Sequence, residues 1–178
     1  MTLVGCTPKN RNTEQHDVFF GIADSVKELV PDLVSFWPEG GEKIHLDAWR
    51  TVTNVNGYKV EVVEAGKNNG SMKLFFINLG GYKQNEFEEF HYKMILAAPD
   101  KGEAITQAKQ TAFYKHTGFQ GAPSHIDDKF GVDVDDVFEI RDILPQSMKE
   151  KYGLRITELK EQLSQDEIHL GYFRLDRL

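Results

Sequence analysis

The sequence has little cysteine, little positive charge and no long apolar run, and each shortage excludes a class of protein. Its single cysteine, Cys6, excludes an internal disulfide and any metal site with several cysteine ligands. Lys and Arg number 21 against 28 Asp and Glu, a net charge of −7, which argues against a duplex-DNA-binding protein. The apolar runs, such as the one at 74–77, have the length of a strand, whereas a bilayer span needs roughly 20 residues. We therefore expect a soluble, cytoplasmic protein that binds neither duplex nucleic acid nor a membrane.

The usual catalytic and nucleotide-binding motifs are also absent. The chain has no Walker loop, no dinucleotide-binding glycine fingerprint, no Gly-x-Ser-x-Gly and no His-Glu-x-x-His. A catalytic Cys6 would need a histidine base and a lowered thiol pKa, and a small residue at a turn explains this position more simply. We therefore assign no catalytic residue, and the interpretation leans away from an enzyme.

What the sequence does contain is an internal repeat. When it is shifted by 75 positions, residues 5–23 acquire five identities, and a shift of 80 then aligns residues 44–47 with 124–127. Self-similarity at a fixed offset is the mark of a duplicated unit. We expect a first copy at residues 1–72 and a second at 73–178, together forming one compact domain.

Both copies have the same pattern of expected elements. Short apolar runs at 17–23 and 92–98 predict strands, and each precedes a helix whose start carries a capping box, Ser25 with Glu28 and Asp100 with Glu103. Further strands are expected at 58–64, 72–79, 154–159 and 168–175, with an extra helix near 145–151. Strands joined by short links predict an α+β fold: one mostly antiparallel sheet with helices on one face, built from two pseudo-symmetric repeats.

Several blocks of the sequence resemble a bacterial domain-of-unknown-function family, number fifteen-forty-three. The resemblance lies in residues 3–9, 14–20, 74–82, 86–91 and 124–128. Members carry one or two copies of a unit with these blocks, so the resemblance implies a two-copy bacterial protein in the cytoplasm. It implies no activity, cofactor or site residue.

The strongest candidate site is a doubled pair of Glu-x-His and His-x-Asp. Residues two apart on a strand face the same side, so each pair can direct an imidazole and a carboxylate to one place. These ligands suit zinc, iron or manganese, although structural hydrogen bonds repeated by the duplication are the favoured explanation of the pattern. The candidate residues are Glu14, His16, His45 and Asp47 in the first copy and Glu89, His91, His125 and Asp127 in the second.

A second candidate site follows the apolar run at 74–77. Asn78, Gly80, Gly81 and Tyr82 lie in a block where paired glycines let the backbone approach a ligand closely, or form a β-bulge.

The function expected from these features is a non-enzymatic module that binds a small molecule or a protein in the groove between the two copies. The alternative is a metal-dependent hydrolase or oxygenase that uses the His, Glu and Asp clusters. The sequence identifies no cofactor, and self-association into a homo-oligomer stays open.

Overall fold

The computed structural model describes residues 1–116, 137–161 and 164–178, together with the backbone of residues 125–126. The strands are β1 (Thr2–Cys6), β2 (Gln15–Phe19), β3 (His45–Trp49), β4 (Asn54–Val55), β5 (Tyr58–Glu64), β6 (Lys73–Tyr82), β7 (Glu89–Ala98), β8 (His125–Ile126), β9 (Val137–Glu139), β10 (Tyr152–Glu158) and β11 (His169–Arg174). The α-helices are α1 (Val30–Phe36), α2 (Lys101–Ala108), α3 (Ala112–His116), α4 (Ile140–Ile143) and α5 (Gln146–Lys151). Three short 3₁₀ helices are η1 (Val26–Leu29), η2 (Pro38–Lys43) and η3 (Leu175–Arg177).

The strands form three antiparallel sheets, ordered β11-β3-β1-β2, β10-β5-β4 and β7-β6-β8, with β9 also paired to β6. The expected α+β class with antiparallel pairing is thus confirmed, but the expectation of one sheet is wrong. The physical reason is that β5 pairs along its whole length with β10, which comes from far along the chain, and not with its neighbour β6.

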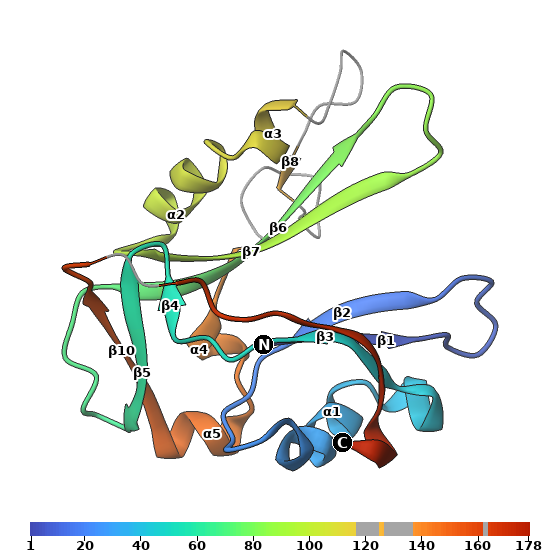
Figure 1. The fold of residues 1–178 in the computed structure, drawn as a ribbon, viewed down its shortest axis with the longest axis horizontal. Helices are drawn as coiled ribbons and strands as arrows, with labels where there is room; N and C mark the ends of the chain where they lie inside the picture. Colours follow the sequence, from blue (N-terminus) through green and yellow to red (C-terminus); the bar gives the residue numbers. More distant parts are fainter. Residues whose placement is uncertain (117–124, 127–136, 162–163) are drawn as a thin grey trace.

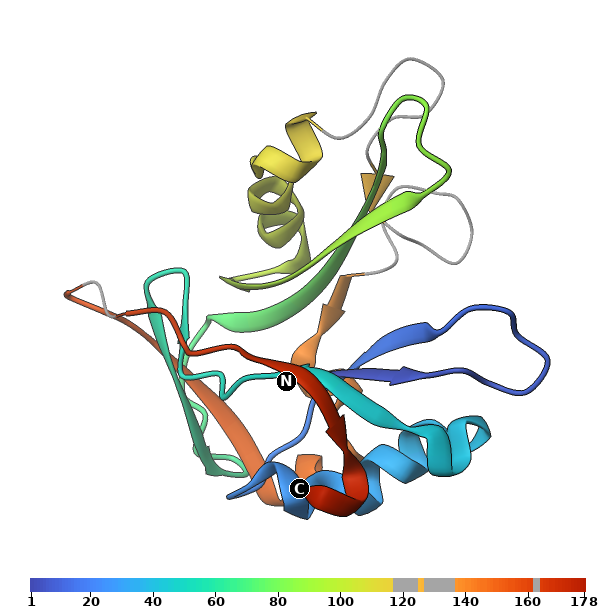
Figure 2. The ribbon, with the colours of Figure 1, turned by 45° about the vertical axis from the view of Figure 1, so that its right-hand side comes forward.

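Two long hairpins, β1–β2 and β6–β7, project from the body of the molecule (Figures 1 and 2). Helices α2 and α3 lie over β6 and β7, whereas η1 and α1 pack against the sheet that contains β1 (Figure 1). Strands β10 and β11 return to pair with β5 and β3, so residues 1–72 and 73–178 share two of the three sheets.

Strand β6 is the centre of the fold because it is buried on both faces. Phe75, Ile77 and Leu79 face a cluster with Ala104 and Ala108 of α2. The alternate residues, Leu74 and Phe76, join a second cluster that includes Phe20, Val60, Ile140 and Leu144. A strand with two buried faces needs apolar side chains at consecutive positions, which explains the run at 74–77.

The two expected capping boxes form different structures. The Asp100 carboxylate accepts a hydrogen bond from the Glu103 amide at 2.9 Å and caps α2, as expected. Ser25 precedes a 3₁₀ turn and its side chain makes no capping bond, while Glu28 accepts from the Asp24 amide. Pro31 then lies in the first turn of α1, where its missing amide proton costs no helical bond.

This difference gives a matched test of the caps. Asp100→Ala is expected to lower the free energy of unfolding by about 0.5–2 kcal/mol, the usual cost of losing an N-cap bond. Ser25→Ala should change it far less because no capping bond is lost. Urea unfolding followed by circular dichroism measures both, and equal losses would contradict the assignment of the caps.

Candidate functional site

The four candidate residues of the first copy converge on one point of the N-terminal sheet. Strand β1 lies between β2 and β3, and Gly5 is opposite His16 on one side and opposite His45 on the other. Glu14 immediately precedes β2, and Asp47 lies two residues after His45 on β3. Glu14, His16, His45 and Asp47 are called the histidine–carboxylate cluster below.

Each carboxylate of this cluster touches both imidazoles. His45 Nε2 lies 3.0 Å from Glu14 Oε1 and 3.4 Å from Asp47 Oδ1. His16 Nε2 lies 3.2 Å from Asp47 Oδ2 and 3.6 Å from Glu14 Oε2. The four side chains therefore form a closed ring of contacts. Within the described residues, no group of three or more His, Cys, Asp and Glu side chains has, as it stands, the arrangement of a metal site.

His45 is the fixed member of the cluster. Its side chain is only 3% exposed, whereas those of Glu14 and His16 are 41% and 39% exposed. Its Nδ1 lies 2.9 Å from the Lys43 carbonyl, and the ring of Tyr172 lies against it at 4.1 Å between centroids. Two of the cluster's buried atoms, His45 Nε2 and Asp47 Oδ2, have no hydrogen-bond partner.

Gly5 lies directly against these two atoms, His45 Nε2 and Asp47 Oδ2. A Cβ at this position would lie 2.7 Å from His45 Nε2 and closer still to Asp47 Oδ2. Real Cβ atoms essentially never approach another atom so closely, so only glycine leaves this space open without a shift of the neighbours. Gly5 is a paired residue of β1, opposite His16 of β2 and His45 of β3.

The second copy has the same strand register. Gly80 on β6 is opposite His91 on β7 and opposite His125 on β8, as Gly5 is opposite His16 and His45. Glu89 contacts His91 at 4.0 Å and accepts a 2.5 Å hydrogen bond from the Tyr82 hydroxyl. Asp127 lies outside the described residues, as does the side chain of His125. This matching register supports the repeat, which stays a prediction.

The remaining candidates lie along β6, away from the first cluster. Gly80 and Gly81 are buried, and Asn78 is opposite Lys93 of β7. No ligand-binding role for these residues is tested by the structure.

Cys6 does not have the environment of a nucleophile. Its side chain is buried among core residues, and burial, followed by the nearby Glu14 and Glu39, raises the pKa of its thiol. A raised pKa leaves less of the reactive thiolate at neutral pH. The sequence predicts a small residue at a turn here, whereas Cys6 is the last residue of β1 and lies in the core.

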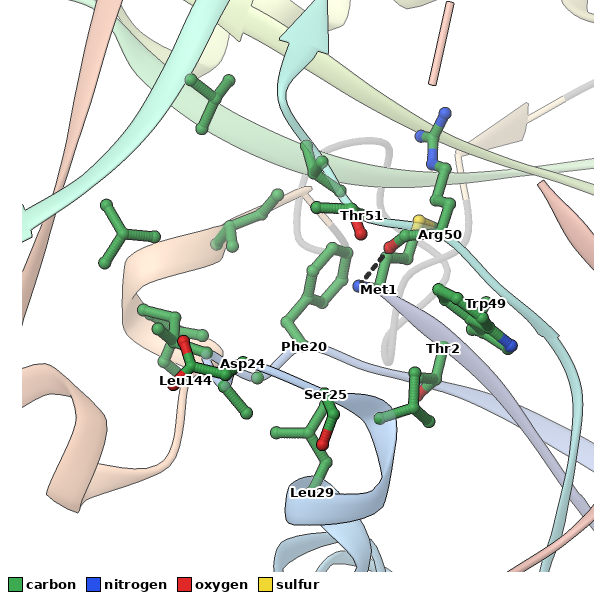
Figure 3. A pocket seen from close by; sticks show the side chains of 18 of the residues that line it. Met1, Thr2, Phe20, Asp24, Ser25, Leu29, Trp49, Arg50, Thr51 and Leu144 are labelled. Atoms are coloured by element: carbon green, nitrogen blue, oxygen red, sulfur yellow. Dashed lines mark hydrogen bonds between the residues drawn. The ribbon is translucent and has the colours of Figure 1, made fainter. Parts of the chain in front are cut away.

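The sequence alone gave no indication of a large apolar pocket beside this sheet (Figure 3). Its cavity volume is about 570 Å³, and it lies between the start of β1, the segment after β2, strand β5 and helix α4. Leucine, isoleucine, valine and phenylalanine side chains from widely separated segments make most of its wall: Phe20, Ile22, Leu29, Val60, Leu74 and Leu144. Hydrophobic periodicity predicts that these residues are buried, but not that they leave a space between them.

Polar and charged residues also line the pocket, among them Asp24, Lys27 and Arg50. Ser25 and Thr51 are among its lining residues, and the Met1 amino group donates a 3.1 Å hydrogen bond to the Arg50 carbonyl (Figure 3). Burial, helped by the Arg50 charge and opposed by Asp166, lowers the pKa of this amino group to about 6.

Comparisons with known proteins agree with the family resemblance and with the fold. The model of the Domain of Unknown Function (DUF1543) family matches residues 11–62, which contain Glu14, His16, His45 and Asp47. Over that range the chain matches the family model, which confirms there the resemblance stated from the sequence. A second copy is not confirmed by this match.

The structural comparison finds protein Il1583 from Idiomarina loihiensis, which is 19% identical with a TM-score of 0.56. The match covers 98% of this chain and 94% of that one, and at this identity it shows a shared fold. The kinetochore protein Nuf2 of Rattus norvegicus is 21% identical over 165 residues, 88% of this chain but only 36% of that protein. No helix in the described residues is long and apolar enough to cross a membrane.

Proposed function

We propose that the chain is a binding module for a small, mostly apolar molecule, held in the 570 Å³ pocket. The observation that carries the proposal is the combination of this volume with a mainly apolar wall. Ligand sites commonly have volumes of about 300–1,000 Å³ and carry a few polar groups that orient the ligand.

The position of the pocket supports the same function. Phe20 and Val60 come from residues 1–72, whereas Leu74, Ile140 and Leu154 come from residues 73–178. Residues from both expected copies thus line the pocket, which supports a binding site between them. The hydroxyls of Ser25 and Thr51 would orient one polar group of the ligand, while its apolar body contacts the wall.

Two half-exposed valines give a matched experiment. Val62 lines the pocket and is 50% exposed, whereas Val34 is 45% exposed on α1 and does not line it. Binding is followed by the fluorescence of Nile red, an uncharged apolar probe, titrated into the full chain. Val62→Trp is expected to weaken probe binding by about tenfold, equivalent to about 1.4 kcal/mol, because the indole occupies part of the cavity.

Val34→Trp is the control and should bind the probe as the unsubstituted chain does. Circular dichroism checks that both variants are folded. The proposal fails if the unsubstituted chain shows no saturable binding, or if both tryptophan variants bind equally well.

A further inference from the structure

We propose that the histidine–carboxylate cluster binds one divalent transition-metal ion above Gly5, with His16 and His45 as nitrogen ligands and Glu14 and Asp47 as oxygen ligands. This site is separate from the apolar pocket and does not depend on the function proposed for it. The inference is drawn from the contacts of the His45 ring, the two buried atoms over Gly5 that lack a hydrogen-bond partner, and the chemistry of the four donors.

The first step is the proton on His45. A carbonyl oxygen only accepts hydrogen bonds, so the 2.9 Å contact with the Lys43 carbonyl places a hydrogen on Nδ1. In the neutral ring Nε2 then presents a lone pair. That lone pair faces Glu14 Oε1 at 3.0 Å and Asp47 Oδ1 at 3.4 Å, two further acceptors. Three acceptors held this close need a positive charge among them.

The geometry at Nε2 also differs from that of a hydrogen bond. Despite the short distances, Nε2 has no hydrogen-bond partner, so neither carboxylate lies in the direction that an N–H would need. A metal ion would meet the same lone pair without requiring a hydrogen-bond angle.

The second step is the space over Gly5. His45 Nε2 and Asp47 Oδ2 are both buried without hydrogen-bond partners, and both lie against the position that a Cβ of residue 5 would occupy. Glycine keeps that position open, as a small ion requires. These two atoms already share one side of the proposed site.

The third step is the movement that would complete the coordination. At present Glu14 and Asp47 each give one oxygen to each imidazole, so the four donors contact one another in pairs. Glu14 and His16 are about 40% exposed and can turn towards the position over Gly5 without disturbing the core. His45 would keep its orientation through the Lys43 carbonyl, the outer contact that metal-binding histidines usually make.

The donor set indicates the class of ion. Two imidazole nitrogens with two carboxylate oxygens suit zinc, manganese or iron(II), whereas calcium and magnesium prefer oxygen ligands alone. The same donors explain why residues two apart on neighbouring strands carry Glu-x-His and His-x-Asp.

The experiment is calorimetric titration of zinc sulfate, and separately manganese chloride, into the full chain after treatment with a chelator. Asp47→Asn keeps the size of the side chain but removes a charged ligand, and His45→Gln removes the fixed nitrogen. His169→Gln is the control, because His169 also lies on a strand of this sheet, stacks on Trp49 and, among the described carboxylates, contacts only Glu167 within salt-bridge distance.

We expect the unsubstituted chain and the His169→Gln variant to bind one more equivalent of zinc or manganese than the Asp47→Asn variant. His45→Gln should lose the same equivalent, and cobalt(II) bound to the unsubstituted chain should show visible ligand-field bands that both cluster variants lack. Circular dichroism identifies a variant that is not folded, in which case Asp47→Asn alone decides. The proposal is overturned if no ion binds, or if the cluster variants bind as much as the control.

Discussion

Phe20→Ala is expected to lower the free energy of unfolding by about 3–5 kcal/mol, the usual cost of truncating a buried phenylalanine. Phe20 is 4% exposed and belongs to the cluster that joins the segment after β2 to β6, α4 and β10. Its ring meets Phe76 edge to face, with centroids 5.4 Å apart. The substitution therefore removes both buried area and a ring contact between the N-terminal sheet and the central strand. Urea unfolding followed by tryptophan fluorescence measures the loss.

Phe36 is the matched control for this prediction. Its ring also makes an edge contact with centroids 5.4 Å apart, with Phe19, but the residue is 41% exposed. Phe36→Ala should therefore cost only about 0.5–1.5 kcal/mol, the size of an aromatic pair with little loss of burial. Equal losses for the two variants would contradict the position of Phe20 in the core.

Local elements of this fold follow from local sequence. The strand expected at 58–64 is β5 (Tyr58–Glu64), and the helix expected near 145–151 contains α5 (Gln146–Lys151). Both depend on patterns within a few residues, apolar alternation in one case and the proline before the helix in the other. Asp100 caps α2 for the same reason, since its partner Glu103 is three residues away.

The arrangement of these elements could not be obtained in the same way. The number of sheets depends on β10 pairing with β5 and on β11 pairing with β3, contacts between residues about a hundred or more apart in sequence. Nothing in the composition of β5 distinguishes β10 from β6 as its partner. Prediction from local sequence also fails at Ser25, where a capping-box pattern precedes a 3₁₀ turn and the capping bond is not formed.

The sequence predicts which residues form the candidate site, but it does not predict how deeply they are buried. The spacing of Glu14 with His16 and of His45 with Asp47 indicates two polar pairs, and the structure brings both pairs together. That His45 is buried, and that Tyr172 covers its ring, depends on the return of β11 to the sheet. The apolar pocket was missed for a related reason, since its wall is assembled from segments across the whole chain.

Substitution of Gly5, the glycine beneath the histidine–carboxylate cluster, is expected to affect both the stability of the fold and the contacts of the cluster. Gly5→Ala is expected to lower the free energy of unfolding by about 1–3 kcal/mol, the usual cost of overpacking a well-packed position. The new Cβ would lie 2.7 Å from His45 Nε2, and His45 has little freedom to move because it is buried and its Nδ1 is bonded to the Lys43 carbonyl. Asp47 is 26% exposed and would turn away first, so the variant should also lose the contact between Asp47 and His16.

Gly70→Ala is the control for this last prediction. The nearest atom to a Cβ at residue 70 is the Ile156 carbonyl oxygen at 3.8 Å, an ordinary contact. That variant should be unchanged or slightly more stable, because alanine restricts the unfolded chain more than glycine does. Combining Gly5→Ala with His45→Ala should restore part of the lost stability relative to the sum of the two single changes, since the part of the overlap that involves the imidazole is removed. Strictly additive losses in urea unfolding would show that Gly5 is required by its backbone and not by the side chains above it.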